Sequence, residues 1–332
     1  MNKPLSESLP DIEVKQGDLS PYKSGNIGID YVHRFDSGIP GPHVLINALT
    51  HGNEICGMVA ATHLLDNNVR PLKGTLTVSF ANVEAYNAFD PDRPFDNRQL
   101  VHNLNRIWSA EMLDSDEQSP ELRRARELRP VVGEADHILD IHSTSSDVDP
   151  FWVYIPFERN SLLASSVAQP AIHLLLPGGL TTGTGLMQYA QHGTEDGPGA
   201  AVVVECGQHF KRAAADLATD VTLRFLAHYG LINHPEQIEA TNAKEQPTET
   251  GAAQAHKSAS PRRFKLLETH VVKSQDFTFS RPLVGLERFS KDEVIARNGD
   301  ETIVAPCDEC TVFMPTREPI VGREAVYLTL PV

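Results

Sequence analysis

Apolar, β-branched runs alternate with helical patterns between Gly41 and Gly207, and this alternation limits the fold more than any other feature of the chain. Such runs are typical of buried strands, and the amphipathic stretches between them are typical of helices that cover a sheet. We therefore predict an α/β fold with a largely parallel central sheet. The predicted strands are HVLINAL at 43–49, TLTVSFANV at 75–83, HILDIH at 137–142, FWVYI at 151–155 and AAVVVEC at 200–206, and the predicted helices are Asn53–Leu65, Ser119–Arg129 and Ala213–Tyr229.

The last third of the chain has a different pattern. Residues 235–262 contain no aromatic residue and almost nothing to bury, which predicts a flexible linker. After it, short alternating segments and turn signals such as NGDE at 298–301 predict a small all-β domain. The predicted division is therefore a first domain at 1–234, the linker at 235–262 and a β domain at 263–332.

Charge and hydropathy exclude several classes of function. The chain has 44 acidic and 29 basic residues and a net charge of −15, with no Lys/Arg cluster longer than two, so we expect no nucleic-acid partner. No apolar run approaches the roughly 20 residues that a membrane span needs. The polar, acidic start of the chain lacks a secretory signal, so we expect a cytoplasmic protein; the sequence leaves room for a homo-oligomer.

The four cysteines do not predict a disulfide framework. Cys56 and Cys206 stand alone and are expected to be small buried residues. Cys307 and Cys310 form a C-x-x-C motif, but no further ligands with compatible spacing follow, so we expect no second metal site there.

The motif THGNE at 50–54 carries the clearest chemical signal. It follows the strand at 43–49 and begins a predicted helix, so that His51 and Glu54 are three positions apart on a first turn. An imidazole and a carboxylate at this spacing converge on one ion, although an isolated H-x-x-E also fits an ordinary helix start with a capping acid.

Two other predicted strands end on residues that complete such a site. HILDIH ends on His142, and AAVVVEC carries Glu205 next to its last residue. The carboxyl ends of strands in an open α/β sheet meet at one edge, where ligands gather. We therefore predict a metal site of His51, Glu54 and His142 with a bound water, and Glu205 as the base that accepts a proton from that water. The alternative for Glu205 is a structural carboxylate at a strand end.

Two further motifs accompany these, the N-R pair in HNLNRIW at 102–108 and the E-x-G of VVECGQH at 203–209. With all four motifs, the chain resembles the succinylglutamate desuccinylase/aspartoacylase family, relatives of the zinc carboxypeptidases. The resemblance covers nearly the whole chain. It implies a carboxypeptidase-like mixed sheet flanked by helices with a small C-terminal β domain. It also implies one Zn²⁺ per chain, held by His51, Glu54 and His142, with Glu205 as general base.

The same resemblance implies substrate contacts. The N-R pair lies in a long loop at 84–106 and implies that Asn105 and Arg106 contact a substrate carboxylate. Arg98, seven residues before Asn105, takes the place of an arginine that stabilises the oxyanion, and Tyr327 matches a C-terminal substrate-binding tyrosine. The family's second carboxylate-binding arginine, about ten residues before the catalytic Glu, has no counterpart here, because QHGTEDGPGAAVVVE offers only His192 as a basic residue.

We therefore expect a zinc-dependent hydrolase of a small N-acyl amino acid or a similar carboxylate-bearing amide. One alternative is a zinc carboxypeptidase that acts on peptides, which would need a cleft open to an extended chain. Another is a metal- or metabolite-binding protein without catalytic activity, which would not need Glu205 or Arg98.

Overall fold

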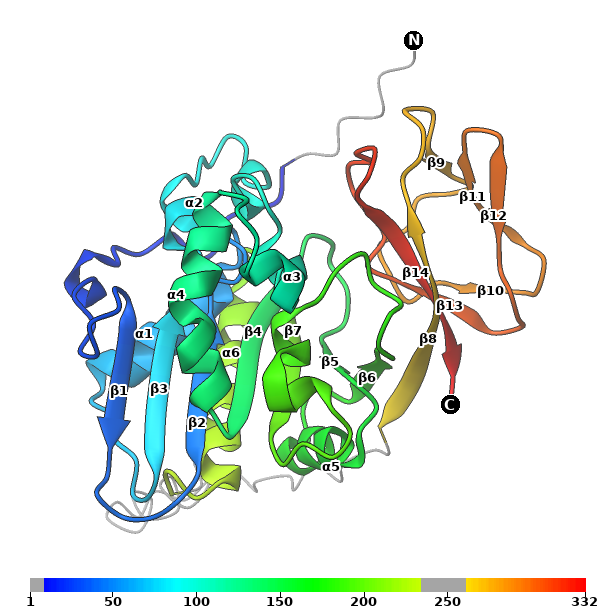
Figure 1. The fold of residues 1–332 in the computed structure, drawn as a ribbon. Helices are drawn as coiled ribbons and strands as arrows, with labels where there is room; N and C mark the ends of the chain where they lie inside the picture. Colours follow the sequence, from blue (N-terminus) through cyan, green and yellow to red (C-terminus); the bar gives the residue numbers. More distant parts are fainter. Residues whose placement is uncertain (1–8, 234–260) are drawn as a thin grey trace, which may run out of the picture.

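The computed structural model describes residues 9–233 and 261–332. Within these ranges the chain forms a large mixed sheet flanked by helices, and a small antiparallel sheet near the C-terminus (Figure 1). The predicted α/β class is confirmed. The predicted linker at 235–262 lies outside the described residues except for its last two positions.

The main sheet has eleven strands in the order β1-β3-β2-β4-β7-β5-β6-β8-β14-β13-β10. Its central strands β3, β2, β4 and β7 are mutually parallel, whereas β1 and β5 run antiparallel to their neighbours β3 and β7. All five predicted strands are present, and β1 and β6 add two strands that the sequence pattern did not reveal. The first seven are β1 (Val32–Asp36), β2 (His43–Ala48), β3 (Thr75–Phe80), β4 (His137–Thr144), β5 (Phe151–Tyr154), β6 (Ile172–Leu175) and β7 (Ala200–Gln208).

Helices cover both faces of this part of the sheet (Figure 1). Helices α1 and α6 pack with each other and bury one core on the same face, while α4 buries a second core on the other face. Helix α4 begins as its sequence predicts, because the Ser119 hydroxyl accepts the Leu122 N–H at 3.0 Å and Pro120 occupies the first turn. The helices are α1 (Ile55–Asp66), α2 (Val83–Asn87), α3 (Ala110–Leu113), α4 (Pro120–Glu134), α5 (Glu158–Val167) and α6 (Arg212–His228).

The predicted helix at Asn53–Leu65 begins two residues later in the structure. Glu54 is the residue before α1 and has a non-helical backbone with φ −93° and ψ 68°. This geometry turns its side chain toward the sheet edge and away from the helix surface, so the predicted first turn is a strand-to-helix loop.

The C-terminal residues form strands, as the turn signals predict. Strand β8 (Arg262–Val271) pairs in parallel with β6 and antiparallel with β14 (Glu324–Pro331), so the main sheet continues without a break into this region. β13 (Cys310–Phe313) and β10 (Arg288–Phe289) complete its edge. A separate sheet contains β9 (Thr278–Phe279), β11 (Val294–Asn298) and β12 (Glu301–Val304), with the NGDE turn joining the last two.

None of the helices described in 9–233 and 261–332 has the length and apolar character of a membrane span.

Candidate metal centre and active site

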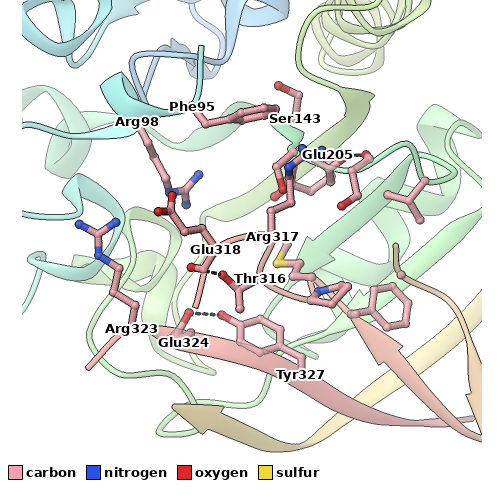
Figure 2. Close-up of a pocket in the computed structure, with 18 of the residues that line it drawn as sticks. Phe95, Arg98, Ser143, Glu205, Thr316, Arg317, Glu318, Arg323, Glu324 and Tyr327 are labelled. Atoms are coloured by element: carbon pink, nitrogen blue, oxygen red, sulfur yellow. Dashed lines mark hydrogen bonds between the residues drawn. The ribbon is translucent and has the colours of Figure 1, made fainter. Parts of the chain in front are cut away.

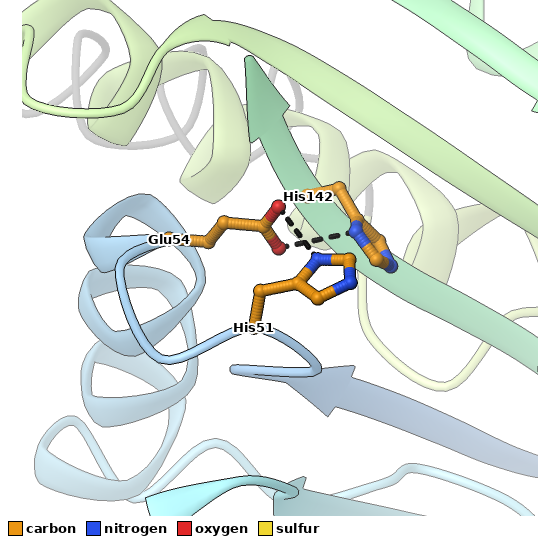
Figure 3. A group of neighbouring side chains, drawn as sticks. All are labelled: His51, Glu54 and His142. Carbon is orange, nitrogen blue, oxygen red and sulfur yellow. Dashed lines mark hydrogen bonds and ion pairs between the residues drawn. The ribbon is translucent and has the colours of Figure 1, made fainter. Parts of the chain in front are cut away.

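His51, Glu54 and His142 come together at the carboxyl edge of the central strands (Figure 3). One ligand atom from each lies within 4.8 Å of the other two, and all three residues are buried. Glu54 lies between the two imidazoles: its Oε1 is 2.9 Å from His51 Nδ1, and its Oε2 is 3.1 Å from His142 Nδ1. The sequence placed these residues at neighbouring strand ends, and the structure brings them into one cluster.

His142 is held by a carboxylate behind it. Its Nε2 is 2.8 Å from Asp140 Oδ2, which leaves Nδ1 directed toward the cluster. Asp140 Oδ1 in turn accepts hydrogen bonds from Thr50 Oγ1 and Asn47 Nδ2, each at 2.8 Å, and all these residues are fully buried. The carboxylate therefore fixes the ring orientation of His142, as carboxylate partners do for metal-binding histidines.

His51 has an equivalent partner on another element. Its Nε2 lies 2.9 Å from Asn103 Oδ1, so its Nδ1 also faces the cluster. Asn103 precedes the short helix η3 (Leu104–Arg106), and the same oxygen accepts the Asn105 N–H at 2.9 Å. Sequence reasoning did not single out Asn103. The sequence feature that could have indicated Asn103 was its position two residues before the N-R pair.

The charges of the cluster suit a cation. Burial and the Arg98 charge lower the pKa of His51 to about 4, so this imidazole is neutral and offers a lone pair at pH 7. Burial raises the pKa of Glu54, but the two histidines outweigh it and hold the pKa well below its usual value, so Glu54 is ionised. Burial opposes protonation of His142, yet Asp140 and Glu54 raise its pKa well above the ordinary value. A cation between these groups would replace that proton.

The donor set fits zinc. Two imidazole nitrogens and one carboxylate form a known catalytic zinc shell that leaves a fourth position for water. One ligand atom from each residue lies within 4.8 Å of the other two, which is close enough for all three to reach one ion. Among the described residues, the buried Glu54 Oε2 has no hydrogen-bond or ion-pair partner other than His142.

Glu205 lies beside the cluster without belonging to it. Strands β4 and β7 pair in parallel with His142 opposite Glu205, so that the two side chains leave neighbouring strands at one level. Glu205 is 6% exposed, and its Oε2 has no hydrogen-bond partner among the described residues. Burial raises the pKa of this carboxyl above its ordinary value, although the neighbouring His142 opposes the shift. Such a group can exchange a proton near neutral pH.

Arg98 reaches the cluster from the short helix η2 (Asp96–Arg98). Its Nη1 is 3.5 Å from Glu54 Oε1, and its side chain is 37% exposed toward the adjoining cavity. Gly52 lets this segment come close, because its N–H bonds the Arg98 carbonyl at 3.0 Å and a Cβ there would lie 2.4 Å from the Asn97 carbonyl oxygen. The predicted oxyanion partner therefore stands next to the predicted metal site.

Arg106 meets a carboxylate that belongs to the protein itself. Its Nε and Nη2 bind the two oxygens of Glu324 at 3.1 and 2.6 Å, and Nη2 also donates to Tyr327 Oη at 2.8 Å. Figure 2 shows Glu324 and Tyr327 together, with the Tyr327 hydroxyl donating to Glu324 at 2.7 Å. Thr182 adds two further donors to Glu324. Sequence reasoning missed Glu324, whose only signal was its place three residues before Tyr327.

Asn105 contacts a neighbouring short helix and also lines a pocket of the site. Its Oδ1 accepts the Leu186 N–H at 2.9 Å, which holds the short helix η4 (Leu186–Gln188) against the N-R segment. Its side chain also lines a small pocket next to the cluster.

Two pockets adjoin the cluster. The outer pocket has a volume of about 410 Å³ and extends toward the C-terminal strands, where the β13–β14 loop forms its wall (Figure 2). The inner pocket has a volume of about 60 Å³ and lies between the cluster and η4. The predicted residues Arg98, Arg106, Glu205 and Tyr327 line both pockets, whereas Asn105 lines only the inner one.

Comparison with known proteins tests the family resemblance that the sequence motifs suggest. Residues 40–169 match the family model described as the succinylglutamate desuccinylase/aspartoacylase catalytic domain. This segment contains the HGNE, N-R and DIH motifs. The resemblance to the succinylglutamate desuccinylase/aspartoacylase family is confirmed. A search of curated proteins gives no match.

Solved structures share the fold of this family over most of the chain. A succinylglutamate desuccinylase from Vibrio parahaemolyticus is 19% identical with a TM-score of 0.66, over 91% of this chain and 86% of its own. Murine aminoacylase 3 is 19% identical with a TM-score of 0.55, over 88% of this chain and 96% of its own. The ectoine utilization protein EutE (DoeB) from Ruegeria pomeroyi is 16% identical with a TM-score of 0.57, over 88% and 86%. At these identities the likeness concerns the fold.

Proposed function

We propose that this protein is a zinc-dependent deacylase that hydrolyses the amide bond of an N-acyl amino acid or a similar small carboxylate-bearing amide. The observation that carries the proposal is the buried cluster of His51, Glu54 and His142 with Glu205 opposite His142 on the next strand. A structural metal site would not need a buried carboxylate beside it whose oxygen lacks a protein partner.

His51 Nδ1, His142 Nδ1 and a Glu54 oxygen would hold the ion, and Asn103 and Asp140 would keep the two rings in place. When bound, zinc supplies a Lewis acid that polarises the substrate carbonyl and makes water a better nucleophile near neutral pH.

Glu205 moves the proton. Its carboxylate accepts a proton from the attacking water and then donates it to the departing nitrogen, which is a poor leaving group unless it is protonated. Arg98 lies close enough to the cluster to face the negative charge that develops on the carbonyl oxygen.

Asn105, Arg106 and Tyr327 bind the substrate carboxylate in this proposal. Because Glu324 neutralises Arg106, attraction for the carboxylate comes from individual donors more than from a net charge. These donors are the Asn105 amide and the second N–H of Arg106 Nη1, whose other contact in the described residues is the Asn105 carbonyl at 2.7 Å. The Tyr327 hydroxyl donates its one proton to Glu324 and would have to turn from it to bind the substrate.

The outer pocket favours small amides over polypeptides. Residues from Met314 to Glu324 of the β13–β14 loop and the start of β14 wall it on the side of the C-terminal strands. This wall limits the room for an extended chain on that side, which weighs against the carboxypeptidase alternative.

The test compares Glu205→Gln with His51→Ala in zinc-loaded protein. Glu205→Gln keeps size and polarity but cannot accept a proton, so it should keep its zinc and its Tm and lose about 10²–10⁴-fold in kcat. His51→Ala should lose zinc and activity together. A zinc-replete, stable Glu205→Gln variant with undiminished kcat would contradict the proposed mechanism, and stoichiometric zinc in His51→Ala would contradict the metal site.

A further inference from the structure

The inner pocket is small, and its lining is divided between polar and apolar side chains. Its volume of about 60 Å³ is well below the roughly 150 Å³ of an apolar cavity that holds benzene. Its apolar lining includes four buried side chains from β5, β7, η4 and the residue after β6, namely Val153, Val203, Met187 and Leu176, and the partly buried Met314. Only a few non-hydrogen atoms beyond a carboxylate fit into this space.

Among the described residues, the inner pocket has no arginine or lysine other than Arg98 and Arg106 to bind a second carboxylate. Of the two arginines that line it, Arg98 faces Glu54, and Arg106 is paired with Glu324. The family's second carboxylate-binding arginine stands about ten residues before the catalytic Glu. In this chain that position is Glu195, which is exposed and lines neither pocket. A carboxylate that enters such a site unpaired carries a large desolvation penalty.

The outer pocket differs in both size and lining. It has a volume of about 410 Å³, and apolar side chains from loops and from the ends of β5 and β13 form much of its wall. Among them are Val148, Phe151, Leu286, Phe313, Met314 and Pro315. Charged side chains, including Arg323 and Glu318, lie toward the exposed part of the β13–β14 loop (Figure 2).

The two pockets meet at residues predicted to act in catalysis or substrate binding. Arg98, Arg106, Glu205 and Tyr327 line both, so a substrate whose amide lies at this junction places one half in each pocket. Of the residues predicted to bind the carboxylate, Arg106 and Tyr327 line both pockets, whereas Asn105 lines only the inner one. Asn105 therefore assigns the inner pocket to the carboxylate-bearing amine half.

We infer that the inner pocket selects an amine half with a small, uncharged side chain, of the size of glycine or alanine, and that the outer pocket takes a bulkier, partly apolar acyl group. This inference rests on the proposed function, because it assumes that an amide lies at the junction. The inferred substrate is not a dicarboxylate, for two reasons. The described residues give the inner pocket no further cation for a second carboxylate, and its volume is small.

The first experiment varies one half of the substrate at a time with zinc-loaded protein. N-hexanoyl derivatives of glycine, alanine, phenylalanine and aspartate test the inner pocket. We expect kcat/KM to fall at least about tenfold from alanine to phenylalanine and from alanine to aspartate. Lengthening acetyl-alanine to hexanoyl-alanine should not lower kcat/KM. Equal or faster cleavage of the phenylalanine or aspartate derivative would overturn the inference.

The second experiment enlarges the inner pocket. Val203→Ala removes lining atoms, whereas Val202→Ala is a matched control, because Val202 belongs to the core on the opposite face of β7. The preference for alanine over phenylalanine should fall at least about threefold in Val203→Ala and stay at the wild-type ratio in Val202→Ala. Met187→Ala, in η4 outside the strands, makes the same test if Val203→Ala does not fold. An unchanged ratio in a folded lining variant would overturn the assignment of the pocket.

Calorimetric titration of zinc-loaded protein with the free amino acids separates this inference from the proposed function. Alanine should bind more tightly than phenylalanine or aspartate, whether or not any amide is cleaved. If no amide is hydrolysed while this order holds, the proposed function fails and the selectivity of the pocket stands. If amides are hydrolysed but aspartate binds most tightly, the function stands and the inference fails.

Discussion

At the scale of single residues, the site depends on groups that orient the histidines as much as on the histidines themselves. Asp140 is fully buried and accepts three hydrogen bonds, one of them from His142 and two from Asn47 and Thr50. Asn47 also accepts a hydrogen bond from Ser79, so a polar network crosses three neighbouring strands, β3, β2 and β4. Because every member has a partner, the network holds the His142 ring without leaving a buried group unsatisfied.

We predict that Asp140→Asn weakens zinc binding about 10–100-fold, since loss of such a partner changes the orientation and basicity of the ligand. Competition with a chelator measures this change. Asp136→Asn is the matched control, because Asp136 is exposed and caps the start of β2 through the His43 N–H at 2.7 Å. Equal zinc affinity in both variants would show that Asp140 does not position the ligand.

At the scale of elements, the loop between β2 and α1 has to fit closely against η2. The backbone of Gly52 approaches both Ala85 and Asn97, so that a Cβ would lie 2.4–2.6 Å from atoms of the main chain. Backbone atoms cannot yield as a flexible side chain can. The close packing places Arg98 next to Glu54, and it explains why the second residue of HGNE is a glycine.

Gly52→Ala should therefore move η2 away from the metal cluster. We expect a loss of about 1–3 kcal/mol in the free energy of unfolding and a lower kcat from the displaced Arg98. Gly178→Ala should change neither, because a Cβ at Gly178 would have no neighbour within 4 Å and the backbone there has no positive φ. Urea unfolding and steady-state kinetics test the pair. Wild-type kcat in Gly52→Ala would show that the position of η2 does not matter for catalysis.

At the scale of the whole molecule, the ion pair of Arg106 and Glu324 joins the long loop to the C-terminal strands across 218 positions of sequence. The side chains are 21% and 17% exposed, so the contact is mostly shielded from water. Burial raises the pKa of Glu324, but the charge and hydrogen bonds of Arg106, with those of Thr182 and Tyr327, outweigh it and lower the pKa to about 2. The ionised form of Glu324 therefore stabilises the folded chain.

Because the pKa of Glu324 is lower in the folded chain than its ordinary value of 4.5, its contribution is complete above pH 4.5 and declines toward pH 2. Glu324→Gln should cost about 3 kcal/mol at pH 7, because it leaves Arg106 without a counter-charge. Its deficit relative to wild type should shrink as the pH falls below 4.5. Urea unfolding of metal-free protein at several pH values measures this. A pH-independent deficit would contradict the assignment.

Glu309→Gln is the control for that experiment. Glu309 pairs with Arg288 on the surface, where both side chains are more than half exposed. Such a pair is worth about 0–1 kcal/mol, so its loss should leave unfolding close to wild type at every pH.

The sequence could predict the central strands and the residues at their ends, because both follow from local pattern. Buried parallel strands produce long apolar runs, and their carboxyl ends share one edge of the sheet, so His51, His142 and Glu205 had to lie near one another once the strands were recognised. Strands β1 and β6 and helix α5 were not predicted, since elements of five, four and ten residues are too short to show a clear periodic pattern. The roles of Arg98, Asn105, Arg106 and Tyr327 remain predictions.

Only the tertiary structure decided which partners these residues have. Asn103 reaches His51 across 52 positions and Glu324 reaches Arg106 across 218, and no local pattern encodes a contact between side chains that far apart. The joining of the C-terminal strands to the main sheet through β6 and β8 likewise depends on edge pairing between distant segments. Backbone hydrogen bonds at a sheet edge accept almost any sequence, so the residues in these strands determine that they are strands but not which strand they will pair with.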